Sequence, residues 1–96
     1  MTSPQKVRQV GVDLQDSEET RPLLEAIEQD NPGANVSRMP GLVKIQKPGE
    51  LVIRRETVED RMGREWETHE FQVSIVSYSG NIAVWDDDEI VIKWEH

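Results

Sequence analysis

Cysteine is absent from this 96-residue chain, which excludes disulfides and thiolate metal sites and is typical of a reducing compartment. Long apolar runs are absent too: the longest covers residues 82–85, whereas a helix needs roughly 20 apolar residues to span a bilayer. The first nine residues contain no apolar stretch of the kind that a signal peptide requires. We therefore expect a soluble, cytoplasmic protein that does not bind membranes.

Positive charge is scarce. Eleven Lys and Arg residues stand against 19 Asp and Glu residues, which gives a formal net charge of −8. Because binding to phosphate groups depends on positive charge, nucleic acids and anionic membranes are poor partners. Two interpretations of the acidic excess stay open, namely solubility alone and steering towards a basic groove on a larger partner.

Recognisable catalytic motifs are missing as well. No glycine spacing fits a dinucleotide- or phosphate-binding loop, and no G-x-S-x-G sequence is present. Neither histidine, His69 or His96, has a Glu three positions before it, so the Glu-x-x-His pattern of carboxylate-bridged metal sites is absent. The acidic residues 86–89 lack the alternating ligands and central glycine of a calcium loop, which favours a solvated turn. We expect no catalytic residue, no metal site, no cofactor and no small-molecule ligand.

Alternating apolar residues dominate the rest of the chain and predict strands with one buried face. The expected elements, in chain order, are a strand at 10–14, a helix that starts within the acidic residues 16–19 and stops at Asn31, strands at 34–39, 42–47 and 50–54, a helix at 56–62, a strand from 71 to about 78, and strands at 82–85 and 90–94. This pattern predicts an α+β fold with two short helices packed on mainly antiparallel small sheets, roughly β-α-β-β-β-α-β-β-β.

Turn residues divide these elements. Lys47-Pro48-Gly49-Glu50 places Pro and Gly at the central positions of a type II turn, which predicts a hairpin between the strands at 42–47 and 50–54. Gly63 is suited to end the second helix. We expect residues 1–9 to form a flexible N-terminal tail and residues 10–96 to form a single domain.

The alternation of apolar residues predicts different positions for the aromatic residues. Trp66 and Trp94 are predicted core or core-edge residues, whereas the position of Trp85 is ambiguous. Tyr78 is out of phase with the apolar residues before it and lies beside the small residues of a turn. Exposed aromatics in such surroundings are common at protein interfaces, and on the residues alone a structural role and a binding role both remain open.

Several short motifs, in this order, resemble one known family. They are Asp30-Asn31-Pro32-Gly33, Met39-Pro40-Gly41, Arg54-Arg55-Glu56-Thr57-Val58-Glu59, Gly63-Arg64-Glu65-Trp66, Ser77-Tyr78-Ser79-Gly80-Asn81-Ile82, and Asp86-Asp87-Asp88-Glu89 with Trp94. Together they resemble the coupling, effector or regulatory proteins of bacterial soluble diiron multicomponent monooxygenases, over about residues 10–94. The family includes the small components of phenol hydroxylase and of toluene, alkene and methane monooxygenases.

The resemblance implies a non-enzymatic, monomeric effector. Such a protein binds the hydroxylase close to its diiron centre and couples the use of reductant and oxygen to substrate hydroxylation. It also implies that Ser77, Tyr78, Ser79, Gly80 and Asn81 contact the hydroxylase. Only about nine residues precede the first expected strand, which favours the phenol, toluene or alkene components over the methane type. A generic acidic adaptor or inhibitor of another protein is the alternative, and a small cofactor-free enzyme is a third class.

Overall fold

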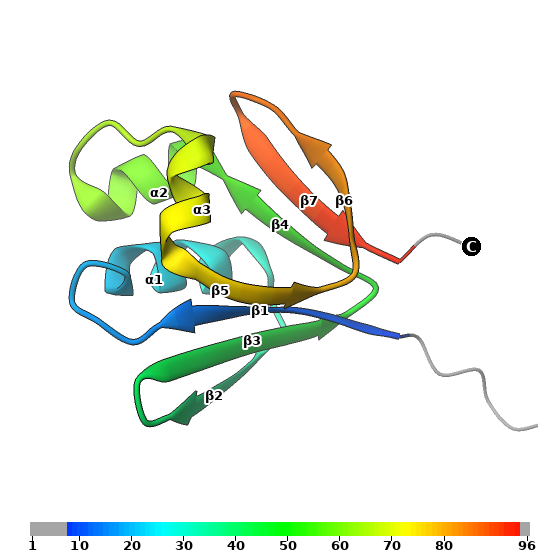
Figure 1. Cartoon of the computed structure of the whole chain (residues 1–96). Coiled ribbons are helices and arrows are strands. Elements are labelled where there is room, and N and C mark those ends of the chain that lie inside the picture. The colour runs from blue at the N-terminus through cyan, green and yellow to red at the C-terminus, as the bar shows by residue number, and fades with distance from the viewer. Residues whose placement is uncertain (1–7, 95–96) are drawn as a thin grey trace, which may run out of the picture.

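The computed structural model of the chain describes residues 8–94 and has the expected α+β architecture (Figure 1). Its elements are β1 (Gln9–Gln15), α1 (Arg21–Asp30), β2 (Asn35–Met39), β3 (Leu42–Pro48), β4 (Glu50–Arg54), α2 (Arg55–Met62), the 3₁₀ helix η1 (Thr68–Glu70), α3 (Phe71–Ser74), β5 (Ile75–Ser79), β6 (Asn81–Trp85) and β7 (Glu89–Lys93). Residues 1–7 of the expected tail and His96 lie outside the described residues, and Gln9 already belongs to β1. Asp16, Ser17, Glu18 and Glu19 precede α1 and do not form its first helical turn.

Two antiparallel sheets enclose the core. The four-stranded sheet has the order β2-β3-β1-β5, and the three-stranded sheet has the order β4-β7-β6. In the first sheet Val12 lies opposite Ile45, and in the second Leu51 lies opposite Ile92, so each sheet turns one apolar face inward. Both faces and the apolar side of α1 belong to one buried cluster. The sequence predicts a single domain over residues 10–96, and on the basis of this shared core we propose that the described part, residues 10–94, forms one domain.

The predicted hairpin at Pro48–Gly49 is wrong. β3 pairs with β1 and β2, whereas β4 pairs with β7, so the turn carries the chain from one sheet to the other. Gly49 has a φ of 89°, as a glycine in such a turn allows, and its N–H donates to the Arg8 carbonyl at 3.1 Å. The turn was therefore located correctly, but its partner strands were not.

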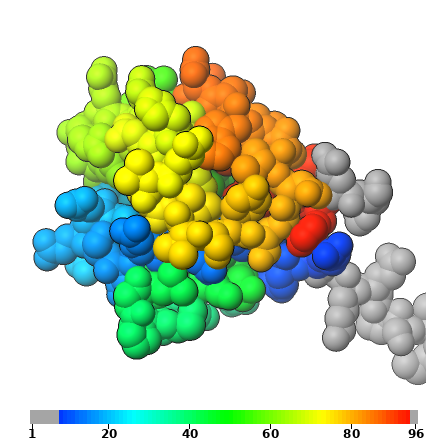
Figure 2. Space-filling view, viewed as in Figure 1, coloured from blue at the N-terminus to red at the C-terminus, as the bar shows by residue number. Residues whose placement is uncertain are grey.

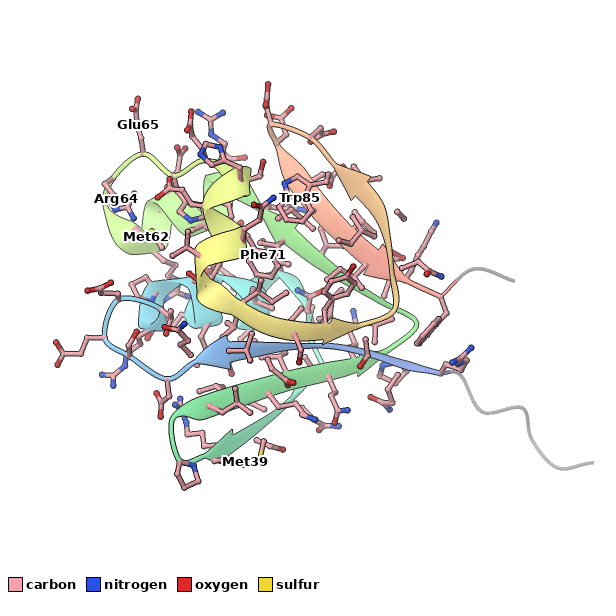
Figure 3. All side chains as sticks on the ribbon, in the orientation of Figure 1. Met39, Met62, Arg64, Glu65, Phe71 and Trp85 are labelled. Carbon is pink, nitrogen blue, oxygen red and sulfur yellow. The ribbon has the colours of Figure 1, made fainter. Side chains whose placement is uncertain are left out.

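The predicted strand from residue 71 is also wrong over its first part. The Glu67 and Glu70 side chains form a capping box that begins η1, and the helical turn continues as α3 before β5 starts at Ile75. The helical geometry points Phe71 inward, where its ring meets Trp85 edge to face at 6.1 Å between centroids (Figure 3). His69 lies in η1.

A β-bulge explains why the position of Trp85 is ambiguous in sequence. The register of β6 on β7 shifts between Ile82 and Val84, so that Ile82 faces Ile92 and Trp85 faces Ile90. A regular strand would place residues three apart on opposite faces, but the bulge brings both onto the core side. Trp85 and Ile82 are half-buried against the core.

Asn31 closes the outer edge of β4. Its side chain is 1% exposed; its Oδ1 accepts the Val52 N–H at 2.9 Å, and its Nδ2 donates to the Val52 carbonyl at 2.7 Å. Nδ2 also donates to the Ile27 carbonyl at 2.7 Å, near the C-terminus of α1. One amide thus satisfies backbone groups of a sheet edge and of a helix end, which would otherwise be buried without partners.

Candidate functional site

The segment of residues 77–81 lies where the chain passes from the four-stranded sheet to the three-stranded one. β5 ends at Ser79 and β6 begins at Asn81, so Gly80 is the single residue between these two strands of different sheets. All five residues predicted to contact a partner therefore lie on one short stretch at the junction of β5 and β6. Their individual surroundings differ.

Gly80 is required by the fold. Its φ is 126°, and a Cβ atom there would lie 2.8 Å from Cγ2 of Ile92 and 3.1 Å from Cγ1 of Val10. L-residues rarely adopt this backbone conformation, and the first contact is too short for any of them. Gly80 thus lets the backbone approach the protein's own core closely, at Ile92 and Val10.

Ser77 is tied to the neighbouring strand. Its Oγ donates to Oδ2 of Asp13 at 2.6 Å, and Nζ of Lys44 lies 3.9 Å from the other oxygen of the same carboxylate. The three side chains come from β5, β1 and β3, which are adjacent in the sheet. They hold β5 in register across the outer face of the sheet.

Tyr78 is exposed, but not for the reason that its sequence phase suggested. It lies opposite Val12, while Ile75 lies opposite Leu14, because the register shifts at the intervening residues. Directly opposite residues share a face, so Tyr78 and Ile75 lie on the same side of the sheet. Tyr78 is nevertheless 48% exposed, since β5 is an edge strand, and Ser79 and Asn81 are exposed beside it.

Two exposed apolar residues next to this segment were missed from sequence. Val73 is 78% exposed and Val76 is 56% exposed. A strand from Phe71 to Ile75 would have put Val73 on the buried face, whereas the helical turn turns it outward. The capping-box pair Glu67 and Glu70 was the one sequence feature that could have revealed this turn.

An open polar hollow of about 580 Å³ lies between α2 and the β6–β7 turn. Within it Oε2 of Glu59 lies 3.3 Å from Nε of Arg55 and accepts the Trp66 N–H at 2.9 Å. The Trp66 N–H, followed by Arg55, lowers the pKa of Glu59, and Glu59 raises the pKa of Arg55. These contacts tie the Glu59 carboxylate to Arg55 of the same helix and to the Trp66 backbone, while the carboxylates of Glu56, Asp88 and Glu89 also line the hollow.

Three further features of residues 8–94 bear on possible chemistry: the described histidine, groups of metal-ligating residues, and apolar helices. His69 is exposed, with its Nε2 3.5 Å from an oxygen of Glu67. Within the described part of the chain, no group of three or more His, Asp or Glu residues could hold a metal ion. No helix among these residues is long and apolar enough to cross a membrane.

Comparisons with known proteins agree with this arrangement. The chain is 40% identical over 87 residues to the stimulatory component DmpM of phenol 2-monooxygenase from Pseudomonas sp. strain CF600, covering 91% of this chain and 96% of that protein. A solved structure of a phenol hydroxylase–regulatory protein complex contains a chain that superposes with a TM-score of 0.86 at 36% identity, covering 92% of this chain and all of that one.

The soluble methane monooxygenase regulatory protein B shares the fold. Its TM-score is 0.72 at 21% identity, over 99% of this chain and 71% of that one. The model of the MmoB/DmpM family matches residues 8–93, nearly the whole length. This chain belongs to the MmoB/DmpM family.

Proposed function

We propose that this protein is a non-enzymatic effector of a multicomponent monooxygenase. It binds the diiron hydroxylase component near its active site and couples the use of reductant and oxygen to substrate hydroxylation. The observation that carries the proposal is the 40% identity to a stimulatory component over nearly the full length of both chains. The protein acts in the cytoplasm, as a monomer, without a cofactor, nucleic acid or membrane as its own partner.

An effector of this kind acts through differential affinity. A protein that bound two conformations of the hydroxylase equally well would shift nothing, however tightly it bound. Moving an equilibrium from 1:99 to 99:1 requires a preference of about 5.5 kcal/mol for one conformation. The effector therefore needs a surface of defined shape, and no reactive group.

The 77–81 segment supplies such a surface. Tyr78 offers an exposed aromatic ring and Asn81 an exposed amide, while Gly80 and Ser77 fix the backbone on either side of them. Because the backbone is already held in place, little conformational entropy is lost when a partner binds. We propose that Tyr78 is the central contact and that Ser79 and Asn81 flank it.

The test reconstitutes hydroxylase and reductase and measures product formed per NADH consumed, with and without this protein. Tyr78→Ala should melt like the wild type, within about 0.5 kcal/mol, because an exposed side chain is removed. It should weaken binding by about 2 kcal/mol, roughly thirtyfold. Asn81→Ala should show a milder loss.

A matched control is Met39→Ala, since Met39 is also exposed, at 41%, but lies at the end of β2, the strand at the opposite edge of the four-stranded sheet from β5 (Figure 3). This variant should stimulate like the wild type. If the wild-type protein leaves the product-to-NADH ratio unchanged, the proposed function is wrong. If Tyr78→Ala stimulates fully, the contact lies elsewhere.

A further inference from the structure

Large exposed apolar side chains are concentrated on one short stretch of the surface. Among the described residues four are exposed, and three of them, Val73, Val76 and Tyr78, lie within six residues on α3 and β5. We call these three the apolar strip. Figure 2 shows α3 and β5, yellow to gold, forming one continuous surface across the front of the molecule.

Nothing in residues 8–94 covers this strip. β5 lies at the end of the strand order and pairs only with β1, so its other edge has no strand beside it. Exposed apolar side chains along an open sheet edge are a common place for a partner protein to bind.

The acidic excess of the chain is concentrated around the strip. Residues 65–92 contain seven Asp and Glu residues and no Lys or Arg, whereas the other 68 residues contain twelve acidic and eleven basic ones. Two basic residues from outside this stretch reach into it. Arg64 lies 3.5 Å from Glu70, and Arg55 lies 3.5 Å from the Asp87 carbonyl oxygen.

The acidic residues on the two sides of the strip meet in space. Glu65, Glu67 and Glu70 precede it in the chain, and the β6–β7 turn with Asp86, Asp87 and Asp88 follows it. Thr68 Oγ1 in η1 donates to the Asp86 carbonyl at 2.5 Å, which brings the two groups into one acidic rim at the α3 end of the strip. In Figure 2 the orange β6–β7 turn stands directly above the yellow atoms of this region.

We infer that the strip and the acidic rim together form the docking surface, and that its occupant is a hydroxylase surface with an apolar centre flanked by Lys or Arg. This inference rests on the proposed function and extends the contact beyond residues 77–81 to Val73 and Val76. Binding of a second copy of this chain at the strip is disfavoured, because the acidic rims of the two copies would repel each other. Apolar burial sets the dissociation rate, and the rim sets the association rate.

The first test measures affinity for the hydroxylase component that the same organism encodes. Val73→Ser combined with Val76→Ser should weaken binding about tenfold or more, because a central apolar contact is lost. Met39→Ser is the matched control and should bind like the wild type. Both variants change exposed side chains and should melt within a few degrees of the wild type.

The second test addresses the rim without touching the strip. Asp87→Asn combined with Glu65→Gln should slow association severalfold at low ionic strength, and the difference should vanish at high salt. Glu18→Gln combined with Glu19→Gln removes the same charge from the turn before α1 and should leave the rate unchanged.

The outcomes separate this inference from the function on which it rests. If the wild-type protein does not bind the hydroxylase, the proposed function fails. If the wild type binds and the Val73/Val76 variant binds equally well, the docking surface is wrong while the function stands. If the variant loses only self-association in sedimentation, the strip is covered by a second copy and the inference is overturned.

Discussion

Asn31→Asp tests how strongly one buried side-chain amide holds the end of α1 to the edge of β4. The substitution keeps the size of the side chain and replaces Nδ2, a donor, by a carboxylate oxygen. Nδ2 donates at 2.7 Å both to the Ile27 carbonyl and to the Val52 carbonyl, so the new oxygen would face two carbonyl oxygens. The site is 1% exposed, and water cannot take the place of the lost donor.

The magnitude follows from the two hydrogen bonds. Leaving a buried acceptor without its partner costs about 1–3 kcal/mol, so the loss of both should cost about 2–6 kcal/mol. For a domain of this size, with about 5–15 kcal/mol in total, the melting temperature should fall by roughly 10 °C or more. Burial should raise the pKa of the new carboxyl above its ordinary value of about 3.9. The defect should therefore be large at neutral pH and should shrink as the pH falls through the raised pKa towards about 4, because the folded protein then holds a protonated carboxyl that can donate again.

Urea unfolding at pH 7 and pH 4 measures both parts of this prediction. Asn35→Asp is the matched control, since Asn35 is exposed in β2 and should tolerate the change within about 0.5 kcal/mol. An unchanged urea midpoint for Asn31→Asp at pH 7 would refute the reasoning. So would a defect of the same size at both pH values, because a neutral carboxyl should recover one donor.

Three further predictions concern the core and its border. Trp66→Ala should cost roughly 3–5 kcal/mol, because the ring is 1% exposed; an unchanged melting temperature would show that the cavity collapses at no cost. Glu59→Gln should be less stable than the wild type at neutral pH. The difference should shrink as the pH falls below 4.5, the ordinary pKa of a Glu side chain, because the lowered pKa of Glu59 gives stability that is lost on protonation. A difference that does not depend on pH in urea titrations would contradict this. Gly80→Ala should cost about 2–4 kcal/mol, from the positive φ and the 2.8 Å contact with Ile92, and circular dichroism melting that matches the wild type would show that the turn relaxes freely.

The regular strands and the helix ends could be predicted from the sequence. Val10, Val12 and Leu14 alternate as they do in β1, and Gly63 ends α2 in the left-handed conformation with a φ of 72°. These features depend on local periodicity and on the conformational freedom of glycine, both of which can be recognised in a short window. The partner of a strand is a property of the whole chain, which is why the turn at Gly49 was found but was assigned to a hairpin.

The site was predicted less completely, for a related physical reason. Bulges at residue 76 and at residue 83 each shift the phase of a strand by one residue, so inward and outward positions cannot be counted across them. Tyr78 is exposed, but the sequence left a structural and a binding role for it both open, and the structure contradicts the strand phase that set it apart. Val73 was missed because alternation placed it with Phe71, whereas the helical turn separates the two.

The helical turn at α3 links the core to the proposed docking surface. Phe71 is 1% exposed and packs on Trp85, while Val73, two residues later, is 78% exposed. At the other end of the apolar strip, Gly80 packs against Ile92 of the second sheet. The strip is therefore held at both ends by residues fixed in the core, and it cannot adapt to partners of different shape without disturbing the fold. A surface of this kind can discriminate between two conformations of a hydroxylase, and that discrimination is what an effector without chemistry of its own requires.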